Sequence, residues 1–151
     1  MRLTLDSNIL VYAAHEGDRR NARAVALVDR ASRGDCVQTV QSFGETFRIL
    51  TVRRSFAPAL AIETIQKLRL LFAVVAATEE DLATAMDAVR DHRLSFWDAM
   101  LWATARRAGC RLLITEDGHD GRNLGGVRFV NPFKSENDVL LDVVLPVERP
   151  S

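Results

Sequence analysis

Short β-branched segments alternate with longer amphipathic segments along the chain. This pattern predicts an α/β domain, a three-layer α/β/α sandwich around a mostly parallel sheet. Strands are expected at residues 2–5, 36–40, 71–75, 111–115 and 127–130. Helices are expected at residues 8–15, from about 20 to a stop at 34, at 42–53, from 58, from 79, and at 96–108. The helix after Thr78, which a capping box should open, places Leu82, Met86 and Val89 on one apolar face.

The compact pattern closes at Asn131-Pro132-Phe133. We therefore predict one domain over residues 1–133 and a C-terminal tail over 134–151. Within the tail, Val143-Val144-Leu145 fits either an edge strand or a segment that covers a neighbouring element.

Composition narrows the possible classes of function. The 20 acidic and 20 basic residues balance, so any polyanionic partner must be held by local rather than overall charge. The longest apolar run, residues 70–77, is too short to span a bilayer, and the N-terminus does not resemble a signal peptide. We expect a cytoplasmic protein with no membrane contact, in which Cys36 and Cys110 are buried free thiols.

Four carboxylates are candidates for one site. Asp6 and Asp117 each follow a predicted strand, and ligands of open α/β sheets bind at the carboxyl ends of the strands. Glu45 and Asp98 are expected in the first turns of helices, and these helices can begin at the same edge of the sheet. The sequence thus allows the four acids to converge.

Each acid also has a purely structural interpretation. Ser42-x-x-Glu45 and Ser95-x-x-Asp98 match capping boxes, in which serine and acid satisfy the free amides of a helix start. Asp6 and Asp117 could each form an Asx turn. The residue pattern alone leaves both interpretations open.

Taken together, the acidic motifs resemble those of PIN-domain ribonucleases. The motifs are Asp6-Ser7-Asn8, Glu45, Leu94-Ser95-Phe96-Trp97-Asp98-Ala99 and Leu113-Ile114-Thr115-Glu116-Asp117. The segment 125–133 is similar to the end of VapC-type toxins of toxin-antitoxin pairs. Gly-His-Asp at 118–120 departs from the apolar residue that usually follows the fourth acid.

This resemblance implies a PIN-like fold and a Mg²⁺- or Mn²⁺-dependent endoribonuclease, the toxin of a type II toxin-antitoxin system. It implies Asp6 and Asp98 as principal metal ligands, with Glu45 and Asp117 holding water molecules of the metal or a second ion. Oxygen ligands suit both metals, which activate water for attack on a phosphodiester. Ser7, Asn8 and Thr115 would support the acids by hydrogen bonds.

The resemblance also implies partners: an RNA substrate, a cognate antitoxin protein, a second copy in a homodimer, and DNA only indirectly through the antitoxin. Val11-Tyr12 and the 43–50 segment could dock an antitoxin helix or belong to the core. The alternative function is a PIN-like interaction protein without catalysis, or part of a DNA-binding repressor complex. A phosphatase with Asp6 as nucleophile fits poorly, because Asn8 stands where such enzymes usually have a second aspartate.

Other residues could carry different chemistry. His15, His92 and His119 suggest a metal-free ribonuclease with paired imidazoles, although no pattern places two of them together. Trp97 and Trp102 could stack on bases, but we expect both in the core. Three arginine clusters could contact phosphates or lie on solvated helix faces: Arg19-Arg20-Arg23, Arg48 with Arg53-Arg54, and Arg106-Arg107.

Overall fold

The computed structural model describes residues 1–150 and confirms a mixed α/β fold with mostly parallel strands. The main sheet has the order β1-β4-β6-β5, and the smaller sheet pairs β2 with β3. All pairs are parallel except β5 with β6. The strands are β1 (Leu3–Leu5), β2 (Val37–Thr39), β3 (Ala73–Val75), β4 (Leu112–Ile114), β5 (Asn123–Leu124) and β6 (Val127–Val130).

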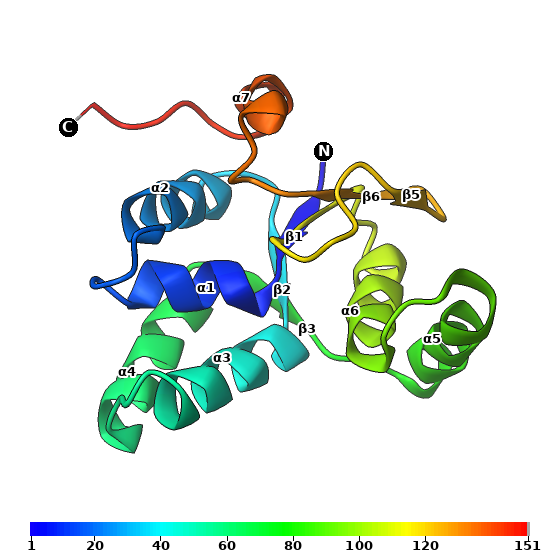
Figure 1. The fold of residues 1–151 in the computed structure, drawn as a ribbon, viewed down its shortest axis with the longest axis horizontal. Coiled ribbons are helices and arrows are strands. Elements are labelled where there is room, and N and C mark those ends of the chain that lie inside the picture. The colour runs from blue at the N-terminus through cyan, green and yellow to red at the C-terminus, as the bar shows by residue number, and fades with distance from the viewer. Residues whose placement is uncertain (151) are drawn as a thin grey trace.

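Helices cover both sides of the strands (Figure 1), with α1 to α4 on one side and α5 and α6 on the other. They are α1 (Ser7–Ala14), α2 (Asn21–Ser32), α3 (Val40–Val52), α4 (Pro58–Arg69), α5 (Glu79–His92) and α6 (Phe96–Arg107). A 3₁₀ turn (Ser135–Asn137) and α7 (Asp138–Val144) follow the last strand. No helix of residues 1–150 is both long and apolar enough to cross a bilayer.

Side chains of the central strands alternate between two hydrophobic cores, as the two-residue period of a strand requires. On β4, Leu112 and Ile114 pack among α1 to α4, whereas Leu113 packs against α5 and α6. On β6, Val130 packs in the core formed with α1 to α4, and Phe129 packs in the core formed with α5 and α6. Strands buried on both faces are largely apolar, which explains the continuous Leu112-Leu113-Ile114 run.

The tail joins the larger core. Leu141 of α7 and Leu145 directly after it are buried in the same cluster as Leu3 and Leu5. The Val143-Val144-Leu145 segment therefore does not extend the sheet, and Val143 is exposed. Arg30 of α2 fixes the segment after α7, because its guanidinium donates to the backbone oxygen of Pro146 at 2.7 Å.

The predicted apolar face of α5 is present but points to solvent rather than to the core. The Thr78 and Asp81 capping box is present, but Leu82, Met86 and Val89 are exposed, and the buried positions are Asp81, Ala85 and Ala88. Small alanines allow α5 to lie close to α6, and Arg107 of α6 pairs with Asp81 at 2.9 Å. The residues of α5 that face α6 are therefore small, whereas the hydrophobic periodicity had favoured the larger Leu82, Met86 and Val89 for burial.

The start of α3 also differs from the prediction. The helix begins at Val40, and Thr39 caps it by accepting the backbone N–H of Ser42 at 3.0 Å. Ser42 lies within the helix and is not its cap. The capping box proposed for Ser42 and Glu45 is therefore wrong, and Glu45 is free of that structural role.

Candidate metal centre

Asp6 occupies the junction of β1 and α1. Its carboxylate accepts the backbone N–H of Ser7 at 2.7 Å and so caps α1, and it also accepts the hydroxyl of Thr115 at 2.8 Å. The side chain is nearly inaccessible, with 5% of the residue exposed. Burial raises the pKa of Asp6 to about 7, assisted by the negative charges of Asp117 and Glu45 and opposed by the two hydrogen bonds.

Asp117 lies next to Asp6 because their strands are parallel neighbours. β1 pairs with β4 from Leu3 with Leu112 to Leu5 with Ile114, so both strands end at the same edge. The turn after β4 is fixed by Thr115, whose hydroxyl oxygen accepts the backbone N–H of Asp117 at 3.1 Å. Burial and the charges of Asp98 and Glu116 raise the pKa of Asp117.

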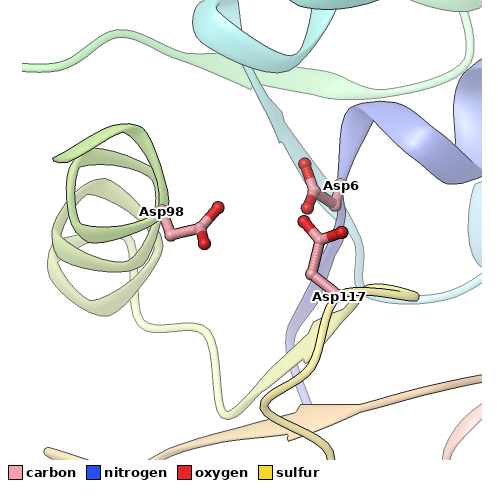
Figure 2. Close-up of side chains that lie close together, drawn as sticks. All are labelled: Asp6, Asp98 and Asp117. Carbon is pink, nitrogen blue, oxygen red and sulfur yellow. The ribbon is translucent and has the colours of Figure 1, made fainter. Parts of the chain in front are cut away.

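Asp98 enters the site from the other helical layer. Ser95 caps α6 by accepting the backbone N–H of Asp98 at 3.3 Å. Within residues 1–150 the Asp98 carboxylate makes no return bond to Ser95, so the reciprocal capping box is incomplete. Figure 2 shows this carboxylate directed at Asp6 and Asp117 instead.

The three aspartates form one cluster. One carboxylate oxygen from each lies within 4.8 Å of the others. Three acids at this spacing repel one another strongly unless a proton or a cation lies among them. The donor set, carboxylate oxygens only, fits the preference of Mg²⁺ and Mn²⁺ for hard ligands.

Glu45, the fourth predicted acid, lies beside this cluster rather than in it. Its carboxylate accepts the hydroxyl of Ser7 at 3.1 Å and the side-chain amide of Gln41 at 2.6 Å. Ser7 also donates its backbone N–H to Asp6, so it connects the two acids. Glu45 is thus positioned from α3 at the edge of the aspartate cluster.

The predicted supporting residues all contact the site. Ser7 and Thr115 donate to the carboxylates as described. Asn8 donates to the hydroxyl of Thr115 at 3.3 Å and accepts the backbone N–H of Glu116 at 3.4 Å. These bonds join the start of α1 to the turn that carries Asp117.

Sequence reasoning missed the neighbours of Glu116. Its carboxylate accepts Arg20 at 2.8 Å and the hydroxyl of Tyr12 at 2.8 Å, and the Arg20 guanidinium stacks 3.8 Å from the centre of the Tyr12 ring. The only feature of the sequence that could have pointed to Glu116 is its charge next to Asp117. Nothing in the sequence pointed to Gln41, which donates to Glu45.

The histidines lie in different surroundings. Nδ1 of His15 lies 2.8 Å from Arg54, and its ring packs edge-on against Phe56, whereas Nε2 of His119 is 3.7 Å from Asp98. His92 ends α5 on the surface. This arrangement gives no support to the paired-imidazole hypothesis.

The prediction that both tryptophans lie in the core is correct for one and wrong for the other. Trp102 is buried and donates its indole N–H to the backbone oxygen of Leu124 at 3.0 Å, as expected of a core residue. Trp97 is 62% exposed, so its predicted core position is wrong. Cys36 and Cys110 are buried free thiols, as predicted.

The chain belongs to the PIN domain family, whose model matches residues 3–119. PIN domains are nucleases. This match covers β1 and β4, the strands that Asp6 and Asp117 follow, and all three aspartates of the cluster. No curated protein matches the chain at a significant level.

Solved structures with the same fold include toxins and toxin-antitoxin complexes. VapC20 of Mycobacterium tuberculosis, a sarcin-ricin loop cleaving toxin, is 22% identical to this chain with a TM-score of 0.63, and the match covers 74% of this chain and 86% of VapC20. A toxin-antitoxin complex from Klebsiella pneumoniae contains a chain 19% identical with a TM-score of 0.63, and the match covers 87% of this chain and 98% of that one. VapBC2 from Rickettsia felis, bound to promoter DNA, contains a chain 11% identical with a TM-score of 0.64, and the match covers 85% of this chain and 97% of that one.

Proposed function

We propose that this protein is a Mg²⁺- or Mn²⁺-dependent endoribonuclease, the toxin of a type II toxin-antitoxin pair that acts in the cytoplasm. The convergence of Asp6, Asp98 and Asp117 in a PIN domain is the observation that carries the proposal. Three aspartates from distant segments share one edge of the sheet, and two of them have raised pKa values. A fold places repelling acids together at a cost, which a bound cation offsets.

Asp6, Asp98 and Asp117 would hold the cation, with Glu45 as an additional ligand or a holder of water at its edge. The cation would supply water activation and neutralise charge on the phosphate. Ser7 and Thr115 fix the Asp6 carboxylate by hydrogen bonds, so its oxygens are oriented before any ligand arrives. Asn8 and Thr115 hold the turn of Asp117, which keeps the third acid in register.

An apolar groove supports an antitoxin partner. Its volume is about 220 Å³, and it lies between α1, α2 and α4, lined by Ala13, Ala14, Val25, Val28, Thr64, Lys67 and Leu68. Amphipathic helices bind such grooves through one apolar face. Of the docking residues suggested by the sequence, Val11-Tyr12 and the ends of the 43–50 segment, Phe43 and Leu50, are buried in the core. Phe47 and Ile49 within that segment are half-buried. DNA would be bound only through this antitoxin.

The exposed stripe of Leu82, Met86 and Val89 on α5 supports a homodimer. These residues are spaced by four and three positions, so they share a helix face. Exposed apolar side chains on one face mark association surfaces. A second copy of the chain would cover the stripe.

The nuclease proposal is tested on purified protein with single-stranded RNA. We expect cleavage with Mg²⁺ or Mn²⁺ and none in excess chelator. Asp98→Asn should abolish cleavage, whereas Asp87→Asn, the same change on the exposed face of α5, should not. Cleavage that persists in chelator contradicts metal dependence, and a folded wild-type protein that never cuts RNA favours the non-catalytic interaction protein.

A further inference from the structure

A groove runs between α3 and α6 beside the aspartate cluster. Its volume is about 680 Å³, and its lining residues are Gln41, Gly44, Glu45, Arg48, Ile49, Arg53 and Trp97. Glu45 belongs both to this lining and to the edge of the cluster, and Trp97 directly precedes Asp98. The groove therefore opens next to the proposed site of hydrolysis.

Two arginines in the groove have no acidic partner among residues 1–150. Arg48 and Arg53 are exposed and form no ion pair there, whereas the neighbouring Arg54 pairs with Asp18 at 3.0 Å. A cation at Arg53 is favourable at the end of α3, but Arg48 lies in the middle of the helix, where the dipole does not favour it. Two uncompensated positive charges beside an acidic cluster suit a phosphate backbone.

Trp97 supplies a different kind of contact. Its ring is 62% exposed and is held by Phe96, whose ring centre lies 4.9 Å away at an interplanar angle of 67°. An exposed aromatic ring is a surface on which an unpaired base can stack. Base pairs in a duplex already stack on each other, so this contact selects single strands.

Gly44 keeps the groove open. It lies within α3, where glycine is unfavourable relative to alanine. A Cβ at this position would meet no atom within 4 Å, so packing inside the chain does not require glycine. A ligand that approaches the helix backbone closely would require it.

Gln41 joins the two walls. Its side-chain amide donates to Glu45 of α3 at 2.6 Å and to the backbone oxygen of Trp97 in α6 at 2.9 Å. These bonds hold Trp97 at a fixed distance from the acids. The groove is therefore formed before a ligand binds.

We propose that this groove binds the single-stranded part of the RNA that flanks the bond to be cut. One unpaired base stacks on Trp97, and the adjoining phosphates contact Arg48 and Arg53. The inference rests on the proposed nuclease function and adds to it three binding residues outside the acidic motifs, Trp97, Arg48 and Arg53.

Binding of a fluorescein-labelled mixed-sequence RNA octamer, followed by anisotropy in chelator from 50 to 200 mM salt, tests the groove without cleavage. Trp97→Ala should weaken binding about 5- to 150-fold, and Trp97→Phe should retain most of it. Arg48→Ala and Arg53→Ala should each lower the slope of log affinity against log salt by about 0.7. The control is Arg111→Ala at the opposite end of β4, where an exposed arginine forms no ion pair with any residue of 1–150.

Quenching of tryptophan fluorescence gives a second readout. Because Trp102 is buried, the octamer should quench only Trp97, and Trp97→Phe should remove the change. Variants that bind RNA as the wild type does, while Mg²⁺-dependent cleavage persists, overturn the groove and leave the nuclease proposal standing. Weakened binding without any cleavage supports the groove and overturns the nuclease.

Two further outcomes also decide. If wild-type protein binds no octamer in chelator or in Mg²⁺, the groove inference fails, and the cleavage assay alone decides the nuclease proposal. Sedimentation of the same variants measures self-association. If Trp97→Ala and Arg48→Ala yield monomers from dimers and leave RNA affinity unchanged, the groove is an interface between copies of the chain, and the RNA inference is overturned.

Discussion

The hydroxyl of Thr115 donates to the buried carboxylate of Asp6 across 2.8 Å, linking the end of β4 to the end of β1. The same oxygen accepts the backbone N–H of Asp117 and the side-chain amide of Asn8. One threonine thus sets the positions of two acids.

Thr115→Val removes this hydroxyl while keeping the shape of the side chain. The buried Asp6 oxygen loses a donor, so we expect a loss of about 1–3 kcal/mol in the free energy of unfolding, measured in urea. RNA cleavage should fall as well. Thr115→Ser keeps the hydroxyl and should restore most of both; a valine variant as stable and active as wild type would show that this bond contributes nothing.

Asp98→Asn separates capping from metal binding. The Ser95 bond goes to the backbone N–H of Asp98 and survives the substitution. Removing one of three clustered charges should leave the metal-free protein equally stable or more stable, while cleavage falls by orders of magnitude. Thermal melts in chelator and RNA cleavage assays measure the two effects, and lower stability with normal cleavage would refute the ligand role.

The metal-free protein should lose stability as pH rises. The Asp6 carboxyl has a pKa of about 7 in the fold and 3.8 as its ordinary value, so the folded form retains a proton that the unfolded chain releases. This stabilisation is complete below pH 4 and decreases by about 4 kcal/mol between pH 4 and the folded-state pKa near 7. Urea unfolding in chelator at pH 5 and 8 should therefore show a loss of about 3 kcal/mol, and Asp6→Asn should show a much smaller difference.

Gly44→Ala should stabilise the protein and weaken RNA binding. Alanine in α3 gains about 1 kcal/mol over glycine, and the added Cβ meets no atom of the chain. The same methyl group narrows the groove. Denaturant unfolding and octamer affinity measure the opposing changes; unchanged affinity would mean that RNA does not approach this helix closely.

Met86→Lys should dissociate the proposed dimer. Met86 is exposed on α5 between Leu82 and Val89, so lysine is solvated in the monomer but buried in an interface. Sedimentation should show half the wild-type mass with unchanged thermal stability of the monomer. Leu60→Lys, the same kind of exchange at an exposed apolar position of α4, is the control for surface effects, and an unchanged dimer in Met86→Lys would place the interface elsewhere.

The strand ends could be predicted from the sequence because short segments rich in large aliphatic residues mark the buried strands. Leu112-Leu113-Ile114 and Leu3-Thr4-Leu5 defined the edge at which Asp6 and Asp117 meet. The approach of Asp98 required the docking of α6, which local pattern cannot supply. Its helix start could be predicted, but the direction of its carboxylate could not.

The errors have a common physical origin in tertiary contacts. Ala85 and Ala88 bury more completely than Leu82 because α5 and α6 approach closely, and hydropathy favours the larger residue. Val40 was assigned to a strand for its β-branched side chain, although Thr39 caps a helix that begins there. Trp97 was placed in the core because its ring is large and apolar. On the surface, where the ring actually lies, the same property makes it a platform on which a base can stack.

The amide of Gln41 bonds Glu45 and the backbone of Trp97 at once, and this has a thermodynamic consequence. If Glu45 turns toward a cation, the Gln41 amide loses its bond to Glu45. The Gln41 side chain, which also bonds the backbone of Trp97, is then less firmly fixed, and the position of Trp97 changes with it. Occupancy of the acids and occupancy of the groove are then coupled, and the coupling is reciprocal. Whatever factor a cation contributes to the affinity for RNA, RNA must contribute equally to the affinity for the cation. If the proposed function holds, bound RNA therefore lowers the concentration of free metal needed to fill the site.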